Sequence, residues 1–417
     1  MNISASRPKV VIIGGGFGGL AAARALKKAA VEITLIDRTN HHLFQPLLYQ
    51  VATGGLSPTE ISAPIRTILK DQQNTKVIMA DVIAVDRGKK QVVLSCGSPI
   101  CYDYLVVASG GRHHYFGHSE WEALAPGLKT LEDANRARER FLGAFEAAEK
   151  AETDASRKEW LTFVVVGGGP TGCELAGVLP EIARKALAGE YRSFMPAETR
   201  IILIENSAHV LDSFPDDLRV CATADLKELG VEVIPLRKAA DIQPDHVMLD
   251  DGTRIPCRTV FWAAGNKAGP ICATLGAEQD RAGRVVVTQC LHLCDDNSVY
   301  VIGDAAHVHW HGDMAVPGVA PAARQMGECA GRNIGKLVAG NADLLKFSYI
   351  DKGSMAVLGR NKAVVAAGKL HFHGAIAWLM WLFVHILYLA GYRNRLLVLL
   401  EWAYAYVTYR RGVRYLI

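Results

Sequence analysis

Residues 10–20 read VVIIGGGFGGL, and residues 163–175 read FVVVGGGPTGCEL. Each stretch is an apolar run followed by glycines in the G-x-G-x-x-G spacing, which predicts a strand, a tight turn and the start of a helix. Glycine lets the backbone approach a pyrophosphate there, and the helix N-terminus attracts its negative charge. One such fingerprint is a weak signal, but two predict an α/β protein that holds two dinucleotides. The spaced glycines are Gly14, Gly16 and Gly19 in the first fingerprint and Gly167, Gly169 and Gly172 in the second.

An acidic residue closes the next apolar run after each fingerprint. Asp37 ends EITLID (residues 32–37), and Glu205 ends IILIE (residues 201–205). A carboxylate at this place accepts hydrogen bonds from the ribose hydroxyls of a nucleotide and repels a 2′-phosphate. Glu205 therefore favours NADH over NADPH in the second unit.

A third apolar strand indicates which nucleotide each unit binds. Residues 298–306, SVYVIGDAA, run into Gly303 and Asp304, and a helical stretch follows from about Pro321 to Val338. In two-dinucleotide flavoproteins this strand returns to the first nucleotide domain, and its aspartate bonds the ribityl or pyrophosphate part of FAD. The first fingerprint is therefore predicted to bind FAD.

The composition indicates a folded, multidomain protein and does not suggest nucleic acid as a partner. The chain has 417 residues, 50% of them hydrophobic, and a formal net charge of +4. This is enough apolar material for two or three cores, while the charge is too small to suggest nucleic acid as a partner. Nine cysteines without zinc-like pairing predict no metal site and mostly inert thiols. Cys96 and Cys101 have the C-x4-C spacing of a redox pair but lie in a predicted hairpin, which favours a structural role.

The order of these signals predicts a split first domain. Residues 1–115 and 266–340 are expected to form the FAD-binding domain, and the NADH-binding domain, residues 116–265, is inserted into it. The fold class is α/β, with two Rossmann-like domains and a C-terminal region, residues 341–417, that belongs to neither.

The C-terminal region has the pattern of an amphipathic membrane anchor. Residues 374–391 carry no formal charge, and basic residues follow with a single acid, Glu401. At helical spacing, one stripe of the first segment contains Trp378, Trp381, His385, Tyr388 and Tyr392. Apolar faces flanked by basic and aromatic residues favour a helix that lies in the headgroup region of a bilayer. A spanning helix and a buried dimer interface are the alternatives. The second segment is expected to place a polar stripe, Asn394, Glu401, Tyr404, Thr408 and Arg411, opposite its leucines.

Nearly the whole chain resembles the type 2 NADH dehydrogenases, the single-subunit, non-proton-pumping NADH:quinone oxidoreductases. HHLFQPLLYQ (residues 41–50) and DKGSMAVLGR (residues 351–360) are more specific for this family than the glycine motifs. The resemblance extends to GGGPTGCELAG, VYVIGDAA, AWLMWLFVH and NRLLVLLEW. It implies non-covalent FAD, NADH as electron donor and a membrane quinone as acceptor. It also implies monotopic attachment, expected at the cytoplasmic face of the inner membrane, and a role in a respiratory chain.

The resemblance also implies roles for individual residues. Gly14, Gly16, Gly19, Asp37 and Asp304 would hold FAD, with Pro46 and the segment to Gln50 near its ring, and Gly167, Gly169, Gly172 and Glu205 would hold NADH. Glu174 matches a glutamate beside the nicotinamide and the flavin; its other interpretation is a first-turn acid that favours the helix dipole. Gln325 matches the second glutamine of the family's quinone-site pattern, whereas Pro321 stands in place of the first.

Two rival functions remain at this stage. A sulfide:quinone oxidoreductase shares the architecture but needs cysteines that flank the flavin, and Cys329 has no clear partner in the sequence. Glu205 also has no purpose in an enzyme that does not use NADH. The second rival is a flavin-bound redox sensor tethered to a membrane. Rapid bleaching of the flavin by NADH, with reoxidation by quinone, separates the enzyme from the sensor.

Overall fold

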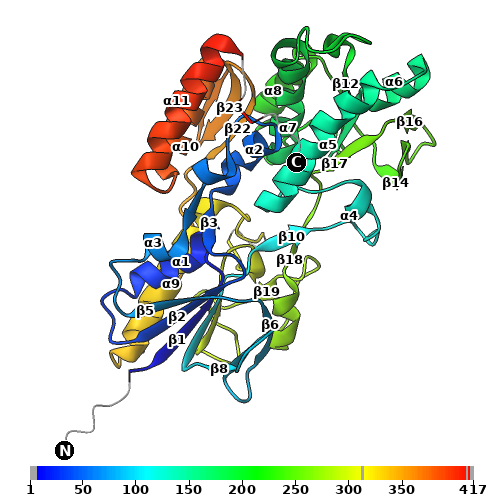
Figure 1. Cartoon of the computed structure of the whole chain (residues 1–417). Coiled ribbons are helices and arrows are strands. Elements are labelled where there is room, and N and C mark those ends of the chain that lie inside the picture. The colour runs from blue at the N-terminus through cyan, green and yellow to red at the C-terminus, as the bar shows by residue number, and fades with distance from the viewer. Residues whose placement is uncertain (1–6, 311–313, 410–411, 414–417) are drawn as a thin grey trace, which may run out of the picture. The chain divides into compact units, whose positions relative to one another are not determined.

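The computed structural model describes residues 7–310, 314–409 and 412–413 (Figure 1). Contacts divide the chain into two units, each assembled from three segments of sequence. Unit 1 comprises residues 1–42, 63–112 and 266–351, and unit 2 comprises residues 43–62, 113–265 and 352–417.

Unit 1 is built on a five-stranded parallel sheet in the order β20–β9–β1–β2–β5. The strands are β1 (Lys9–Ile13), β2 (Glu32–Asp37), β5 (Thr75–Met79), β9 (Tyr104–Val107) and β20 (Val299–Val301). Their residues are largely buried, as is usual for a parallel sheet covered on both faces. The strand order reverses between β1 and β9, and nucleotides bind beyond the carboxyl ends of the strands at such a point.

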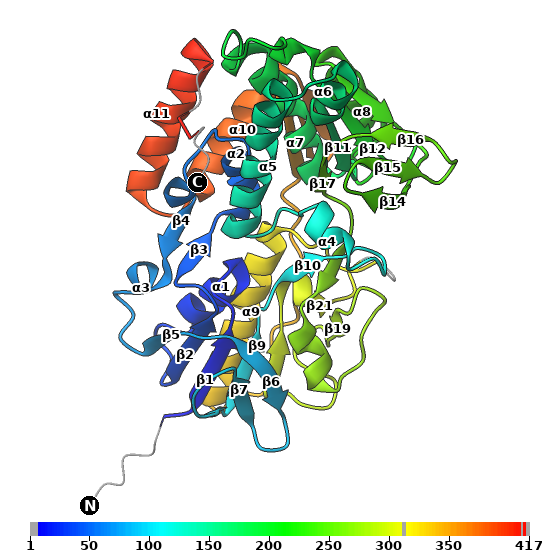
Figure 2. The same ribbon diagram turned by 45° about the vertical axis from the view of Figure 1, so that its right-hand side comes forward.

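Two helices, α1 (Phe17–Ala25) and α9 (Ala320–Val338), pack closely on each other in unit 1 (Figures 1 and 2). A Cβ atom added at Gly327 would lie 2.1 Å from the carbonyl oxygen of Gly18, and one at Gly331 would lie 2.7 Å from that of Ala22. Glycine therefore allows this close approach. As a result, α9 lies alongside the helix that the first glycine fingerprint begins.

Unit 2 repeats the parallel arrangement with four strands in the order β13–β12–β11–β17. These are β11 (Thr162–Val166), β12 (Arg200–Ile204), β13 (Val231–Ile234) and β17 (Thr259–Trp262), accompanied by α5 (Leu131–Glu149), α7 (Pro170–Glu181) and α8 (Asp216–Glu228). A separate antiparallel sheet follows, with β14 (Ala239–Gln243), β15 (His246–Leu249) and β16 (Arg254–Pro256).

The C-terminal residues of unit 2 form an antiparallel sheet and two helices. The elements are β22 (Ser354–Gly359), β23 (Lys362–Ala367), β24 (Leu370–His373), α10 (Ala375–Tyr388) and α11 (Tyr392–Thr408). Strand β22 packs on α7 so closely that a Cβ atom at Gly177 would meet the carbonyl oxygen of Leu358. The guanidinium of Arg360 pairs with Glu181 of α7 and donates to the carbonyl oxygens of Ala405 and Tyr406 near the end of α11. Residues 352–409 of the C-terminal region are thus an integral part of unit 2, whereas residues 341–351 belong to unit 1.

The faces of α10 and α11 differ from the sequence prediction. The predicted stripe of α10 is split, because Trp381 and His385 are buried while Tyr388 and Tyr392 are exposed. Asn394 of the predicted polar stripe is buried and donates to the carbonyl oxygen of Ser62 (3.0 Å). Arg411 of that stripe lies outside the described residues. The reason is that both helices are apolar around most of their surface, so periodicity alone does not decide which face is inside.

The outward faces of both helices carry large apolar side chains, and these residues form the outer apolar face. Its members are Ile376, Leu379, Phe383 and Leu387 on α10 and Leu396, Leu399, Leu400 and Val407 on α11. No helix among the described residues is long and apolar enough to cross a membrane.

The remaining elements are shorter. Unit 1 contains α3 (Ile65–Ile68), β6 (Val82–Asp86), β7 (Gln91–Leu94), β8 (Ile100–Cys101), β19 (Val285–Val286) and β21 (Ala306–His307), with 3-10 turns at Pro270–Leu275 and Gly303–Ala305. Unit 2 contains α2 (Leu48–Ala52), α4 (Trp121–Leu124) and α6 (Asp154–Trp160), a π-helical turn at Ile182–Ala186, and 3-10 turns at Gln45–Leu47, Pro58–Glu60 and Pro196–Glu198. Strands β3 (His41–Leu43), β4 (Ser62–Pro64), β10 (Gly111–His113) and β18 (Asn266–Ala268) lie where the chain passes between units.

Candidate active site

The first glycine fingerprint forms a turn in which side chains have no room. Gly14 has φ +101°, and a Cβ atom there would lie 2.3 Å from the carbonyl oxygen of Ala108. A Cβ atom at Gly19 would lie 1.8 Å from the carbonyl oxygen of Gly14. Gly16, the N-cap of α1, faces open space instead. The three glycines therefore leave bare backbone and a helix N-terminus at the place where a pyrophosphate binds in this fold.

Asp37 holds this turn together. One carboxylate oxygen accepts the backbone N–H of Gly15 (2.6 Å). The other accepts the backbone N–H of Thr39 (2.7 Å) and the Thr39 hydroxyl (2.8 Å). The carboxylate is thereby fixed at the carboxyl end of β2, beside the glycine turn.

Asp304 lies just after β20, where glycine backbone approaches its carboxylate closely. Gly303 has φ +67°, which glycine adopts without strain. Cβ atoms added at Gly318 and Gly111 would stand 3.2 Å and 3.4 Å from the carboxylate oxygens of Asp304. A side chain at either glycine would therefore crowd the carboxylate, so glycine allows this close approach of the backbone.

His42 supports the first turn and was missed by the sequence analysis. Its Nδ1 lies 3.1 Å from the carbonyl oxygen of Gly15, so Nδ1 is the protonated nitrogen, and its ring meets Phe17 edge to face. Burial lowers the pKa of this imidazole, which keeps it neutral. The motif HHLFQPLLYQ contained the signal, but nothing local connected His42 with a residue 27 positions earlier.

The second fingerprint reproduces the first almost contact for contact. Gly167 has φ +104°, and a Cβ atom at Gly172 would lie 1.8 Å from the Gly167 carbonyl oxygen. Gly169 is the N-cap of α7 and faces open space. Glu205 accepts the N–H groups of Gly168 (2.6 Å) and Ser207 (2.7 Å) through its two oxygens. Each oxygen keeps a further lone pair with which it can accept a ribose hydroxyl.

Glu174 lies in the second turn of α7, not in the first turn as its dipole interpretation required. The helix begins at Pro170, so the first turn contains no acid. Burial raises the pKa of the Glu174 carboxyl to about 8, although the backbone N–H of Val357 and the indole N–H of Trp381 both favour the ionised form. The Trp381 nitrogen itself is buried and reaches no partner with standard hydrogen-bond geometry. The raised pKa favours the protonated carboxyl near neutral pH.

An aromatic cluster in unit 2 joins the inner face of α10 to residues of the HHLFQPLLYQ motif. Trp381 stacks on His385 with ring centroids 4.0 Å apart, and it also contacts Tyr49 and Trp402. His385 meets Phe44 edge to face. Its Nδ1 lies 2.7 Å from the carbonyl oxygen of Trp381, and burial lowers its pKa to about 4.

The Pro46–Gln50 segment is anchored within the same unit. Pro46 is the second residue of the 3-10 turn Gln45–Leu47 and is half-buried. The side-chain oxygen of Gln50 accepts the indole N–H of Trp402 (2.7 Å), and its amide nitrogen donates to the Tyr49 hydroxyl (2.8 Å). These contacts fix the segment to α11. A position of Pro46 beside the flavin stays a prediction.

Gln325, in unit 1, clamps a neighbouring backbone segment. Its amide nitrogen donates to the carbonyl oxygen of Ile350 (3.0 Å), and its oxygen accepts the N–H of the same residue (3.0 Å). Asn333, two turns further along α9, makes the same paired contact with Leu345. Pro321, which replaces the first glutamine of the family pattern, lies in the first turn of α9, where it needs no N–H partner.

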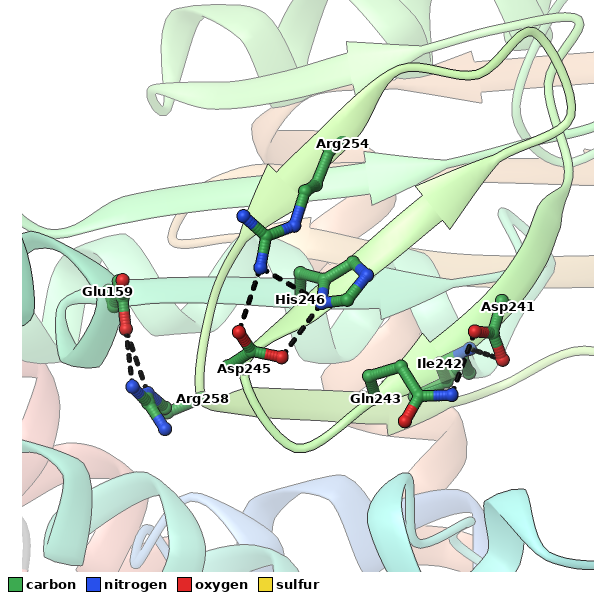
Figure 3. A network of polar contacts seen from close by, with 8 residues as sticks. All are labelled: Glu159, Asp241, Ile242, Gln243, Asp245, His246, Arg254 and Arg258. Carbon is green, nitrogen blue, oxygen red and sulfur yellow. Dashed lines mark hydrogen bonds and ion pairs between the residues drawn. The ribbon is translucent and has the colours of Figure 1, made fainter.

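A cavity of about 330 Å³ also lies in unit 2, away from the glycine turn. Its lining includes Arg140, Trp160 and Arg258 but none of the residues assigned to nucleotides. Figure 3 shows the ion pair of the lining residue Arg258 with Glu159 and, on the antiparallel sheet, the pair of Arg254 with Asp245. These partly exposed pairs are typical of a solvated surface.

Comparison with known proteins agrees with this geometry. Residues 8–327 match the family model described as pyridine nucleotide-disulphide oxidoreductase, which defines the class of this two-dinucleotide fold. Residues 352–411 match the NDH2 C-terminal domain. Type II NADH:quinone oxidoreductase NdhA of Mycobacterium tuberculosis is 44% identical over 97% of this chain and 88% of its own sequence. The chain therefore belongs to the type II NADH:quinone oxidoreductase family.

Solved structures confirm the predicted fold class. NDH2 from Plasmodium falciparum, in complex with NADH, has a TM-score of 0.90 at 18% identity and covers 98% of this chain and 99% of its own. A sulfide:quinone oxidoreductase from Aquifex aeolicus has a TM-score of 0.75 at 19% identity, with 93% and 92% covered. At such identities the likeness concerns the fold alone. The family assignment rests on the sequence relatives.

Proposed function

We propose that separate regions of this chain bind FAD, NADH and the membrane, and that together they carry out the FAD-dependent transfer of electrons from NADH to quinone, without proton pumping. Residues 1–115 and 266–340 bind FAD non-covalently, residues 116–265 bind NADH, and residues 341–417 attach the enzyme to the membrane. The observation that carries this proposal is the pair of matching glycine turns, each closed by an acid.

The residues of the first turn suit FAD. Bare backbone at Gly14, Gly16 and Gly19 admits a pyrophosphate, while Asp37 presents a fixed carboxylate to a ribose. Asp304, a carboxylate with glycine backbone close beside it, suits a ribityl or pyrophosphate group. FAD, when bound, supplies the hydride acceptor and passes the electron pair to quinone. The protein contributes binding, orientation and a proton source.

Glu205 sets the preference for NADH in this proposal. Its carboxylate is fixed by two backbone N–H groups, bonds the ribose diol and repels a 2′-phosphate. NADH should be preferred over NADPH in kcat/KM by about tenfold or more, on the order of 1.4 kcal/mol. Glu205→Ala should lower the ratio of kcat/KM for NADH to kcat/KM for NADPH, as measured by steady-state kinetics with both nucleotides. Equal kcat/KM values in the parent enzyme would contradict the assignment.

Glu174 is proposed as the acid that supplies a proton for quinone reduction. At neutral pH its carboxyl is protonated because burial raises its pKa to about 8. Reduction of a quinone to a quinol consumes two protons, so a neutral acid can deliver one of them. Its location on α7 puts this acid on the helix that the NADH turn begins.

Gln325 is proposed to contact the quinone head group. One amide hydrogen and one oxygen lone pair are used by Ile350, so one donor and one acceptor site remain. Gln325→Ala should raise the quinone KM by roughly tenfold while flavin reduction by NADH stays near the parent rate. Stopped-flow measurement of the two half-reactions checks this. A variant that slows flavin reduction and leaves reoxidation unchanged would place the quinone elsewhere.

A control separates quinone contact from loosening of the clamped segment. Lys336 of α9 donates to the carbonyl oxygen of Asp343 (2.6 Å), at the far end of the segment that Gln325 holds. Lys336→Ala removes a bond to this segment without touching the proposed quinone site. It should leave the quinone KM unchanged.

Membrane attachment is proposed to be monotopic, through the outer apolar face of α10 and α11. Such a face suits the interface between headgroups and acyl chains. The attachment is proposed for the cytoplasmic face of the inner membrane, where the enzyme meets soluble NADH. The test of the whole proposal is an assay of purified protein with NADH and a short-chain quinone. Sulfide as alternative donor should give no turnover.

A further inference from the structure

The segment that follows β13 lies beside Glu205. The backbone N–H of Arg237 donates to the carbonyl oxygen of Glu205 (3.0 Å), and that of Leu236 donates to Ser207 (3.2 Å). Strands β12 and β13 pair in parallel up to Ile204 and Ile234, so the segments that follow them leave the sheet side by side at the carboxyl ends of the strands. An arginine side chain that starts here is long enough to reach a group bound at the Glu205 carboxylate.

Arg237 is, however, held by an acid from the neighbouring antiparallel sheet. Its Nε donates to Asp251 (2.6 Å), and its Nη1 donates to the carbonyl oxygen of Leu236 (2.8 Å). Asp251 lies in the turn between β15 and β16, where its other oxygen accepts the N–H of Thr253 (3.0 Å). The turn itself is tied to the same segment, because the N–H of Asp250 donates to the carbonyl oxygen of Lys238 (3.0 Å).

Asp251 stays ionised in this setting. The Thr253 N–H and hydroxyl, followed by the Arg237 guanidinium, lower the pKa of its carboxyl to about 2. The pair is partly exposed, with side-chain exposures of 40% for Arg237 and 35% for Asp251. Exposed ion pairs add little to stability. Substitutions in this pair should therefore change ligand recognition without unfolding the protein.

A free arginine beside the ribose site would favour the wrong nucleotide. NADP-binding Rossmann domains accommodate the 2′-phosphate with a nearby arginine, because guanidinium binds phosphate strongly. An arginine that is already neutralised and oriented by a carboxylate binds the phosphate much more weakly. We propose that Asp251 is a second specificity determinant, which withholds Arg237 from the 2′-phosphate of NADPH. This inference rests on the proposed NADH site at Glu205.

Removal of the counter-charge tests the inference by ligand binding as well as by activity. Asp251→Asn should tighten binding of 2′,5′-ADP, which carries the 2′-phosphate, by roughly three- to fivefold in calorimetric titration of the FAD-loaded enzyme. Binding of 5′-AMP, which lacks that phosphate, should not change. The kcat/KM for NADPH should rise by a similar factor while that for NADH stays at the parent value.

Two controls identify the group responsible. Arg237→Gln combined with Asp251→Asn should abolish the gain, since the released cation is gone. Arg237→Gln alone should leave NADPH use unchanged, because this arginine is withheld in the parent enzyme. Asp245→Asn breaks a comparable exposed pair with Arg254 on the same sheet (Figure 3). It should change neither the affinity for 2′,5′-ADP or 5′-AMP nor the kcat/KM for NADPH or NADH.

The outcomes separate this inference from the function on which it rests. If Glu205→Ala leaves the NADH preference unchanged, the NADH site itself is wrongly placed. If Glu205→Ala narrows the preference but Asp251→Asn adds nothing, the NADH site stands and the inference is overturned. The inference is also overturned if Asp251→Asn still tightens 2′,5′-ADP binding or raises the kcat/KM for NADPH when it is combined with Arg237→Gln. The expected result is that Glu205→Ala and Asp251→Asn together raise NADPH use more than either alone.

Discussion

Replacement of Glu174 by glutamine should lower quinone-dependent turnover by about a hundredfold, the lower end of what a positioned acid contributes. The amide keeps the size of the side chain but has no transferable proton. FAD content should be unaffected, because the glycine turn, Asp37 and Asp304 that are proposed to hold FAD lie in unit 1, whereas Glu174 lies in unit 2. The loss should fall on reoxidation by quinone, and flavin reduction by NADH should stay within a few-fold of the parent rate.

The pH dependence of turnover should identify the group. Below about pH 8 the Glu174 carboxyl is protonated, so turnover should be level there and should fall as the acid ionises. The glutamine variant should lack this alkaline limb. If the limb persists unchanged in Glu174→Gln, another group supplies the proton.

Stability should respond to the same titration with a definite sign. An acid with a raised pKa binds more protons in the folded state than in the unfolded chain, so the free energy of unfolding falls as pH rises. The loss should begin near the ordinary pKa of 4.5 and be complete a little above pH 8. Glu174→Gln removes the burial of an ionised group. At pH 9 the variant should exceed the parent in unfolding free energy by about 1–3 kcal/mol, measured by denaturant titration.

The local parts of the nucleotide sites could be predicted from the sequence because their physics is local. Gly19 and Gly172 are required by contacts within one turn, and Gly14 and Gly167 by their positive φ, although the close contacts of the latter two are with residues at the end of a neighbouring strand of the sheet. Spacing alone therefore identified them. Glu205 followed from its place at the end of a strand.

The contacts made over long sequence distances could not be predicted in this way. His42 supports a turn that begins 27 residues earlier, and Arg237 meets Asp251 across a hairpin. The paired hydrogen bonds from Gln325 to Ile350 could not be predicted either, because nothing in the local sequence distinguishes this glutamine from one on an open surface. Fold topology, which decides these contacts, is not encoded in spacing.

The helices of the C-terminal region illustrate a further limit. In α10 the aromatic stripe and the leucine stripe are both apolar, so a hydrophobic pattern fits either orientation. The structure buries Trp381 and His385 against residues of the HHLFQPLLYQ motif, and it leaves Leu379 and Phe383 outside. The face proposed to meet lipid is therefore the outer apolar face, not the face with Trp381 and His385. Truncation after Val338 would also remove β22, which packs on α7, so point substitutions test the anchor better.

Substitution of two residues on the outer apolar face should release the protein from membranes. Leu379 and Phe383 are 60% and 65% exposed, one turn apart on α10. Burial of a large apolar side chain contributes about 1.5–3 kcal/mol, so Leu379→Gln with Phe383→Gln should weaken partitioning onto lipid vesicles by roughly a hundredfold. Activity with a soluble short-chain quinone should stay near the parent value, because neither side chain faces the aromatic cluster.

The control for this experiment is a similar loss of exposed apolar surface elsewhere. Met79 and Ile83 of unit 1 are 62% and 57% exposed, and their replacement by glutamine should leave vesicle binding unchanged. Basic residues in the first turn of α11, such as Arg393, predict that high salt loosens attachment to anionic vesicles more than to neutral ones. If the α10 double variant still binds vesicles like the parent and instead shifts from dimer to monomer in sedimentation, the outer apolar face is a subunit interface and the membrane assignment is wrong.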